Sequence, residues 1–264
     1  MALYFAEELT APEYSALVTR QIIGILPVAA IEPHGPHLPL STDCDIARGH
    51  LVALSKFLPD TIDSIVLPLQ TIGHSIEHSN FAGTFSHTAE ALLVSWWDVA
   101  QGFYAAGGRK LIIVSSHGGN SGIVSLLSTR LRVELGMLSV SASWLRFGQP
   151  PGLFADREIA YGIHGGDIET SLMLHYWPEK VRRDQLADFS SNGEAWDAET
   201  VALKVHGMVQ MGWMSQDLND AGVVGNALAA SAEKGAASAR HALTGFGGLL
   251  ADVDKFDLER LGSR

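Results

Sequence analysis

Short apolar runs typical of buried strands alternate along this chain with longer segments of helical pattern. The predicted strands are residues 21–31, 64–69, 110–115 and 137–144. The predicted helices are residues 45–57, 88–106, about 120–134 and 166–178. This alternation predicts an α/β sandwich with a mostly parallel sheet, and the continuous apolar run at 110–115 suits a sheet covered on both faces.

The remaining segments are less regular. Residues 225–250 are rich in alanine, and we expect a helical tail that is broken by glycines. Residues 182–219 are polar and irregular, and they are expected either to build subunit contacts or to close a site. The chain has 264 residues, of which 47% are hydrophobic. A chain of this size can bury a stable core without disulfide bonds or structural metal ions. We expect a single domain over residues 1–264.

Charge and cysteine content exclude several classes of protein. With 18 basic and 29 acidic residues, the net charge is -11, which argues against nucleic acid or an anionic membrane as a partner. No apolar run reaches the ~18 residues of a membrane span, and residues 1–10 lack a basic region, so we expect a cytoplasmic protein. The single cysteine, Cys44, excludes an intrachain disulfide. It is expected to be a small buried hydrophobe, with a thiolate ligand or nucleophile as the alternative.

A cluster of metal-ligand residue types follows the first predicted strand directly. The run IEPHGPHLPLSTD contains Glu32, His34, His37 and Asp43. Charged groups at the end of a buried strand are costly to desolvate unless they are paired, and carboxylates with imidazoles suit zinc, manganese or iron. Glu32 and His34 are two residues apart, so extended backbone points both to the same side. Asp43 lies near a predicted helix start, where a plain N-terminal helix carboxylate is the alternative to a ligand.

Two further clusters follow later in the chain. The segment SHGGN places His117 between a strand end and two glycines, a position from which a histidine can bind a metal ion. The alternative is a polar turn in which Asn120 caps the following helix. The segment HGGDIETS opens a predicted helix and contains His164, Asp167 and Glu169. One of these is expected to be a ligand and another a general acid or base, whereas Asp167 is either a first-turn helix carboxylate or a residue that orients a ligand. Functional groups collect outside the carboxyl ends of parallel strands, so we expect the clusters to meet.

A serine hydrolase is an alternative that the sequence disfavours. An HGG run also occurs in the oxyanion loops of lipases, but that chemistry needs a G-x-S-x-G turn. The nearest match here, Gly73-His74-Ser75-Ile76-Glu77, lacks the final glycine.

The three clusters together resemble the signatures of the creatininase (creatinine amidohydrolase) family. The matching segments are E-P-H-G-P-H-L-P-L-S-T-D, S-H-G-G-N and H-G-G-D-I-E-T-S-L-M-L. Weaker agreement comes from Ser75-Ile76-Glu77-His78 with Gly83-Thr84, and from residues 225–226 and 232–235. The resemblance covers about residues 20 to 250 in the same order. It is specific for the family and much less so for the substrate.

The resemblance implies a metal-dependent hydrolase with a three-layer α/β/α sandwich, assembled as a homohexamer. It also implies two divalent ions per chain, commonly zinc, manganese or iron. By position, the family's metal ligands match Glu32, His34, Asp43 and His117. Asp43 matches the carboxylate that bridges the two ions, and Glu169 matches the acidic position expected to complete the ligand set and to assist catalysis. His164 matches the histidine that moves protons during ring opening.

Some positions depart from true creatininases. Gly119 stands where those enzymes carry an acidic metal ligand, and Ile163 stands where they have a glutamate. Ala160 and Tyr161 occupy the stretch in which their substrate-packing tryptophan lies. These differences indicate another member of the broader family, which includes formamide-releasing and peptide-trimming enzymes and a hydrolase of cyclic keto-sugars.

The expected reaction is hydrolysis of a C–N bond in a small cyclic amide or formamide, by a water molecule whose pKa the metal ions lower. Backbone amides of Gly118 and Gly119 are expected to help hold the oxyanion, and His164 to protonate the leaving nitrogen. Ser75, His37 and His78 are candidates for substrate contact, although either histidine could equally be a structural hydrogen-bonder. The alternatives are ring opening of a cyclic keto-sugar, a metal-dependent sugar isomerase or lyase, and a non-catalytic metal-binding scaffold.

Overall fold

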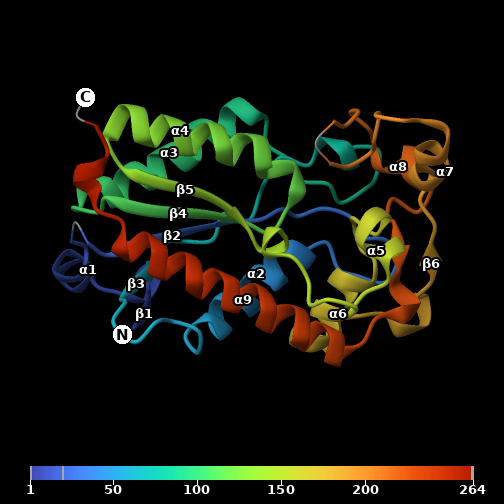
Figure 1. Cartoon of the computed structure of the whole chain (residues 1–264), viewed down its shortest axis with the longest axis horizontal. Coiled ribbons are helices and arrows are strands. Elements are labelled where there is room, and N and C mark those ends of the chain that lie inside the picture. The colour runs from blue at the N-terminus through green and yellow to red at the C-terminus, as the bar shows by residue number, and fades with distance from the viewer. Residues whose placement is uncertain (1, 20, 208, 263–264) are drawn as a thin grey trace.

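A parallel five-stranded sheet forms the centre of the computed structural model, which describes residues 2–19, 21–207 and 209–262 (Figure 1). The strand order is β1-β3-β2-β4-β5, and each neighbouring pair is parallel. The strands are Leu3–Phe5 (β1), Ile23–Val28 (β2), Ser64–Val66 (β3), Lys110–Ser115 (β4) and Leu138–Ser143 (β5). All four predicted strands are present. The edge strand β1 is absent from the prediction because three half-buried residues give too short a pattern to recognise.

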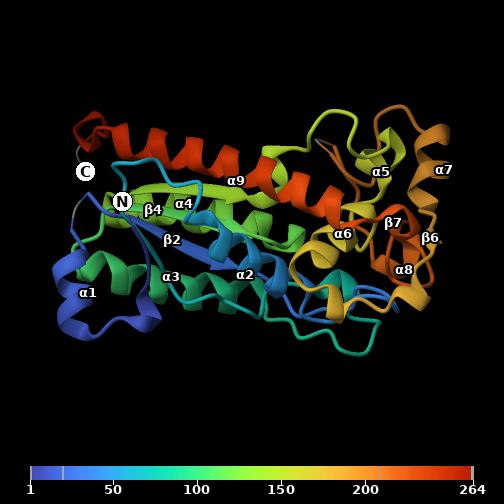
Figure 2. The same ribbon diagram turned by 90° about the horizontal axis from the view of Figure 1, so that it is seen from below.

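Helices cover both faces of this sheet, so the predicted three-layer α/β/α sandwich is confirmed. One face carries α1 (Ala11–Leu17), α3 (Ala89–Ala105) and α4 (Ser121–Leu135), and the other carries α2 (Thr42–Leu54) and α9 (Ala232–Lys255). Figure 2 shows α3 and α9 on opposite sides of β2 and β4. Leu26 and Val28 of β2 pack in the first apolar layer, whereas Ile23 and Ile25 pack in the second. Because β2 is buried on both sides, its sequence is apolar throughout and does not alternate.

The ends of several helices follow signals in the sequence. The Thr88 hydroxyl caps α3 by accepting a hydrogen bond from the Ala91 amide at 3.2 Å. Gly136 ends α4 in the left-handed region, with φ of 70°, a conformation that glycine adopts without strain. Helix α2 begins at Thr42, three residues before the predicted start at 45, and this places Asp43 in its first turn.

The C-terminal tail differs from its prediction. Residues 232–255 form one continuous helix, α9, so the expected breaks at glycines are wrong. Two of these glycines are sites of close packing: a Cβ atom at Gly235 would lie 1.9 Å from the Ser171 carbonyl oxygen, and one at Gly247 would lie 2.4 Å from that of Phe57. The glycines lower local helix propensity, but they let α9 lie directly against its neighbours, and burial of its apolar face outweighs the cost.

The elements between β5 and α9 lie mostly at the end of the molecule away from both termini (Figure 1). They are α5 (Asp156–Tyr161), α6 (Asp167–Tyr176), α7 (Asn192–Glu199), α8 (Ser215–Leu218) and the antiparallel pair β6 (Asp188–Phe189) and β7 (Gly225–Asn226). Helix α6 is the helix predicted near 166–178. The segment expected to be irregular, 182–219, therefore contains short ordered elements.

Two further sequence expectations concern Cys44 and the membrane. Cys44 is buried, its thiol donates to the Ala30 carbonyl at 3.3 Å, and burial raises its pKa to about 12. A thiol with so high a pKa is neither a ready nucleophile nor a ready metal ligand, which agrees with a small buried hydrophobe. Across the described residues, the helices are all too short or too polar to cross a lipid bilayer.

His50 on α2 is a buried histidine away from the sequence clusters. Its Nδ1 lies 2.8 Å from the Tyr176 hydroxyl, and its ring packs against Trp144 at 4.8 Å. Burial, together with the nearby His175, lowers the pKa of His50 to about 3. Between that pH and 6.5, the unfolded chain binds a proton at this side chain and the folded chain does not.

We therefore expect His50 to make folding sensitive to acid. Because its folded pKa is depressed, its contribution is full above pH 6.5 and falls by about 1.4 kcal/mol for each pH unit below it. Denaturant titrations of the wild type and His50→Gln, both treated with chelator, measure this at pH 6.5 and pH 5.0. The wild type is expected to lose about 2 kcal/mol more than the variant over this interval. Parallel losses in the two proteins would contradict the assignment.

Candidate metal centre

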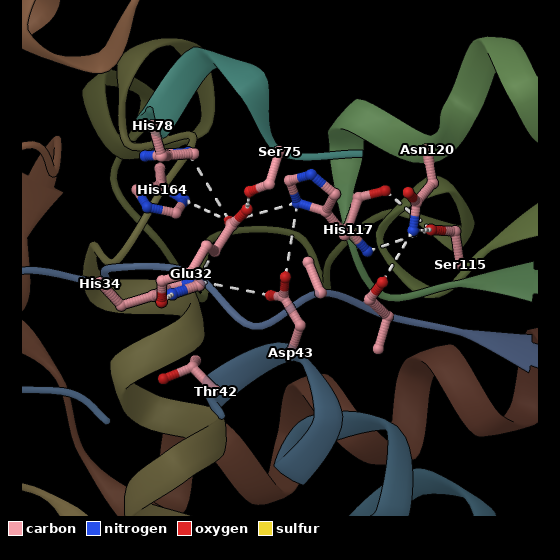
Figure 3. A network of polar contacts seen from close by, with 12 residues as sticks. Glu32, His34, Thr42, Asp43, Ser75, His78, Ser115, His117, Asn120 and His164 are labelled. Carbon is pink, nitrogen blue, oxygen red and sulfur yellow. Dashed lines mark hydrogen bonds and ion pairs between the residues drawn. The ribbon is translucent and has the colours of Figure 1, made fainter. Parts of the chain in front are cut away.

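Side chains from all three sequence clusters meet where the parallel strands end (Figure 3). They reach this place from the segment after β2, the first turn of α2, the segment after β4 and the start of α6. The residues are Glu32, His34, Asp43, His117, His164 and Glu169, and each is at most 9% exposed. The structure thus brings together every residue that was expected to bind metal.

Three of these side chains are imidazoles, and each is anchored by one nitrogen to a backbone carbonyl. The anchoring contacts are His34 Nδ1 to Glu32 at 3.1 Å, His117 Nε2 to His74 at 2.8 Å and His164 Nε2 to Pro33 at 2.9 Å. A carbonyl oxygen only accepts, so each anchoring nitrogen is the N–H donor. In the neutral ring, the other nitrogen then carries a lone pair, and in all three cases that nitrogen points into the cluster.

Asp43 lies between two of the inward-pointing nitrogens. Its Oδ1 is 3.3 Å from His34 Nε2, and its Oδ2 is 3.4 Å from His117 Nδ1. A lone pair and a carboxylate oxygen repel one another unless a proton or a cation lies between them. The two oxygens of Asp43 therefore face two separate places where a cation could bind.

Glu32 occupies the centre of the cluster (Figure 3). Its Oε1 lies 3.2 Å from His117 Nδ1, 3.6 Å from His78 Nε2 and 3.7 Å from His164 Nδ1. The Ser75 hydroxyl donates a hydrogen bond to the other oxygen, Oε2. Ser75, a predicted substrate contact, thus orients Glu32 so that one oxygen faces the imidazoles.

Several atoms at the centre of the cluster have no hydrogen-bond partner among the described residues. They are Glu32 Oε1, His34 Nε2 and Asp43 Oδ2, all buried. Leaving buried polar atoms of charged groups unpaired is costly. A divalent cation supplies the missing partner, and the combination of carboxylate oxygen with imidazole nitrogen fits zinc, manganese or iron.

The pKa values of the cluster show strong coupling between carboxylates and imidazoles. Burial alone would lower the pKa of His34, but Asp43, Glu169 and Glu32 outweigh it and raise the pKa to about 10. Burial and the neighbouring Glu32 raise the pKa of Asp43 to about 6. Burial acts against ionisation of Glu32 as well, yet His117 holds its pKa well below the usual range. Protons on His34 and His117, whose pKa values are both raised, thus balance the carboxylates, and a bound cation would replace those protons.

The donor atoms divide into overlapping groups that could each hold one ion. In each group, one atom per residue lies within 4.8 Å of the others, and the groups are His34 with Asp43 and Glu169, Glu32 with His117 and Glu77, and Glu32 with His34 and His164. The first two groups share no residue. Asp43, which belongs to the first, also reaches His117 of the second, as a bridging carboxylate would.

His37 belongs to the same loop as Glu32 and His34 and contacts the start of α6 and β6. Its Nε2–H donates to the Gly165 carbonyl at 2.9 Å, with the Thr170 hydroxyl at 3.0 Å, and its ring stacks on Phe189. Burial lowers its pKa to about 4. These contacts fasten the first cluster to the start of α6 and occupy Nε2 of His37.

A small cavity of about 10 Å³ opens beside His78 and His164. This volume is close to what one water molecule needs. The remaining walls are Trp213, Ser215, Leu218, Gly222, Val223 and Val224. The sequence predicted that the segment 182–219 either builds subunit contacts or closes a site. Three of its residues line this cavity, so part of the segment lies over the cluster. His78 keeps Nδ1 without a hydrogen-bond partner among the described residues, which leaves it able to contact a bound molecule.

Asn120 has a different role from the predicted helix cap. In the described structure, its side chain makes no capping hydrogen bond to α4. Its Nδ2 donates to the Ala29 carbonyl at 3.0 Å, and its Oδ1 accepts from the His74 amide at 3.0 Å. Asn120 thereby holds the segment whose carbonyl anchors His117.

Glu158 is a functional residue that the sequence analysis missed. It is 5% exposed, and it accepts hydrogen bonds from the backbone amides of Asp167 at 2.6 Å and Asn226 at 2.8 Å. Cβ atoms at Gly162 and Gly166 would each lie 2.2 Å from its carboxylate, so these glycines make room for it. Glu158 therefore positions the start of α6, where His164 and Glu169 lie.

We expect Glu158→Ala to lower the free energy of unfolding by about 3 kcal/mol, because two buried amides lose their acceptor. Urea denaturation measures the loss. Glu199→Ala, at an exposed glutamate of α7, is the matched control and is expected to change stability by less than about 0.5 kcal/mol. Equal effects of the two substitutions would show that the Glu158 contacts contribute little.

Comparison with known proteins gives one family model and several relatives. Residues 7–250 match the Creatininase model, described as creatinine amidohydrolase. The mycofactocin precursor peptide peptidase of Mycobacterium ulcerans (strain Agy99) is 34% identical over 171 residues, or 62% of this chain. The match spans 62% of the length of that relative. The creatinine amidohydrolase of Pseudomonas putida is 29% identical over 202 residues, which cover 70% of this chain and 76% of that protein.

The fold is also found in solved structures. A crystal structure of creatinine amidohydrolase (creatininase) superposes with a TM-score of 0.74 and 23% identity, covering 96% of this chain and 98% of that one. A manganese form of creatininase gives a TM-score of 0.73 at 23% identity over 95% of this chain and 98% of that one. At this identity the likeness establishes a shared fold.

Proposed function

The chain belongs to the creatininase family, and we propose that it is a metal-dependent hydrolase that cleaves a C–N bond. The proposal rests above all on the buried atoms Glu32 Oε1, His34 Nε2 and Asp43 Oδ2. They make no hydrogen bond among the described residues and bring carboxylate oxygens and imidazole nitrogens face to face. Two ions would be held by Glu32, His34, Asp43, His117 and Glu169. Divalent ions bound there supply Lewis-acid chemistry, which activates water and polarises a carbonyl group.

His164 is the residue best placed to move a proton. Its Nε2–H is held by the Pro33 carbonyl, its Nδ1 faces Glu32, and the residue lines the cavity. Burial and the neighbouring His34 lower its pKa, so the neutral ring predominates near pH 7. Neutral His164 can take a proton from the attacking water at Nδ1 and then give it to the leaving nitrogen.

Other residues would bind the substrate. His78 lines the cavity, and its Nδ1 makes no hydrogen bond among the described residues, so the ring can donate to or accept from a substrate atom. The backbone amides of Gly118 and Gly119 are our candidates for holding the oxyanion. Glu169 accepts a hydrogen bond from the Gly165 amide at 2.6 Å, which keeps its carboxylate beside His34.

Because the three signatures of the chain resemble those of the creatininase family, we propose a cyclic amide or a formamide as the substrate. Gly119 and Ile163 differ from true creatininases, so creatinine itself is disfavoured. A second candidate is trimming of a peptide, because the 34% identical relative is a peptide peptidase. A third is a cyclic keto-sugar, because the 3-dehydro-scyllo-inosose hydrolase of Thermotoga maritima is 25% identical over 224 residues, which cover 80% of this chain and 70% of that protein.

Metal analysis by plasma mass spectrometry, before and after reconstitution, tests the proposal first. We expect close to two equivalents of zinc, manganese or iron per chain. The loaded protein is then assayed in ¹⁸O-water with creatinine, N-formyl compounds, short peptides and cyclic keto-sugars. Incorporation of ¹⁸O into an acid product identifies hydrolysis, whereas product without it indicates an isomerase or lyase. A protein that binds no metal after reconstitution would contradict the proposed function.

We also infer that the protein assembles as a homohexamer, following the resemblance of its three signatures. Light scattering coupled to size-exclusion chromatography measures the mass of the assembly. A mass close to that of one 28.3 kDa chain would contradict this inference.

A further inference from the structure

The outer nitrogen of His117 lies beside a carboxylate as well as a carbonyl. Nε2 donates to the His74 carbonyl at 2.8 Å, and Glu77 Oε1 lies 3.4 Å from the same nitrogen. Glu77 belongs to the short helical turn Ile76–His78, far in sequence from the three clusters. For His34 and His164, the described residues place a carbonyl at the outer nitrogen but no carboxylate within 4.0 Å.

The position of Gly119 explains how this carboxylate reaches the ring. A Cβ atom at 119 would lie 2.4 Å from the His74 carbonyl oxygen, 2.5 Å from His117 Nε2 and 2.6 Å from Glu77 Oε1. The backbone of Gly119 is not left-handed, so space and not conformation excludes a side chain there. At neighbouring Gly118, by contrast, a Cβ atom would meet no described atom within 4 Å.

We propose that Glu77 is a positioning residue of the metal centre, acting through His117. Its carboxylate and the His74 carbonyl hold the Nε2–H edge of the imidazole, so that Nδ1 faces Glu32 and Asp43. A carboxylate at the outer nitrogen of a metal-binding histidine fixes the tautomer and ring orientation and raises the basicity of the coordinating nitrogen. The inference rests on the proposed function, because it requires an ion at Nδ1.

Metal affinity of the purified protein, measured by competition with a chromogenic chelator for zinc, tests this role. Glu77→Ala is expected to weaken binding by about 10- to 100-fold. Glu77→Gln keeps an acceptor oxygen without the charge, and its affinity is expected to lie between those of the wild type and Glu77→Ala. Thermal unfolding followed by circular dichroism confirms that each variant is folded.

Two glycine substitutions test the contact between Glu77 and His117 without changing either residue. Gly119→Ala places a methyl group among the His74 carbonyl, His117 and Glu77, and we expect a loss of zinc affinity comparable to that of Glu77→Ala. Gly122→Ala, at a nearby glycine where a Cβ atom would also meet no described atom within 4 Å, is the matched control, and we expect its zinc affinity to equal that of the wild type. Zinc X-ray absorption spectra of the loaded wild type and Glu77→Gln are expected to show the same number of coordinated atoms.

The outcomes separate this inference from the function on which it depends. Unchanged zinc affinity in folded Glu77→Ala, beside a wild type that binds zinc, would overturn the role of Glu77 alone. Loss of a coordinated oxygen in Glu77→Gln would overturn it as well, because Glu77 would then be a direct ligand. A wild type that binds no zinc would overturn the proposed metal centre and this inference together.

Discussion

Asp43→Asn is expected to lose at least one equivalent of metal per chain and to reduce the rate of hydrolysis by more than about 100-fold. A residue that only orients a ligand usually contributes less than this to the rate. The carboxylate faces His34 with one oxygen and His117 with the other, at 3.3 and 3.4 Å. An amide replaces one of these oxygens by an NH₂ group, which cannot bind a cation. Metal content by plasma mass spectrometry and the rate with the best substrate of the panel measure both effects.

The control for this substitution lies two residues further along the same helix. Asp45→Asn also changes a buried carboxylate, but Asp45 pairs with Lys180 at 2.8 Å and with Arg48 at 3.2 Å. Its loss is expected to lower stability and to leave the metal content unchanged. If Asp43 were only a favourable charge at the start of α2, its substitution would cost about 0.3–1 kcal/mol of stability and no metal. Retention of both metal and activity in Asp43→Asn would remove Asp43 from the centre.

His164→Asn is expected to keep its metal and to lose about 10²- to 10⁴-fold in rate, the usual contribution of a positioned acid or base. The ring packs between those of His34 and His78, at 4.1 and 4.2 Å, so its nitrogen lies close to the reacting atoms. Steady-state kinetics, with metal content measured on the same sample, tests the expectation. The loss is expected mainly in kcat, because a proton carrier acts after the substrate has bound.

A different result would give His164 a different role. Its Nδ1 is also close enough to Glu32 and His34 to share an ion with them. If His164→Asn loses metal in proportion to rate, His164 is a ligand and the proton carrier lies elsewhere, with His78 as the next candidate. His175→Asn, at an exposed histidine of α6, is the matched control and is expected to change neither rate nor metal content.

The ligand residues could be predicted because their position in the sequence marks their position in the fold. Apolar strand runs end directly before Glu32 and His117, and the carboxyl ends of parallel strands meet at one edge of the sheet. The order of strands and helices then suffices to predict the three layers. Asp43 follows the same logic, because it opens the helix that comes after β2.

The supporting residues could not be predicted in this way, because their partners are distant in sequence. Glu158 accepts from an amide 68 residues away, and Asn120 donates to a carbonyl 91 residues away. No local pattern distinguishes such a glutamate or asparagine from one at the surface. The glycines of α9 are a related case: locally they indicate breaks, and only the nearby Ser171 carbonyl shows that they allow close packing.

The anchoring of three imidazole rings to main-chain carbonyls has a consequence for how the protein selects its metal. Ring orientation is set by hydrogen bonds to the folded backbone, which do not themselves involve an ion. Carboxylate and imidazole donors suit several first-row divalent ions, so geometry and metal availability decide among those ions more than raw affinity does. The ion found in the purified protein should therefore follow the supply during expression, and exchange in vitro should need no unfolding.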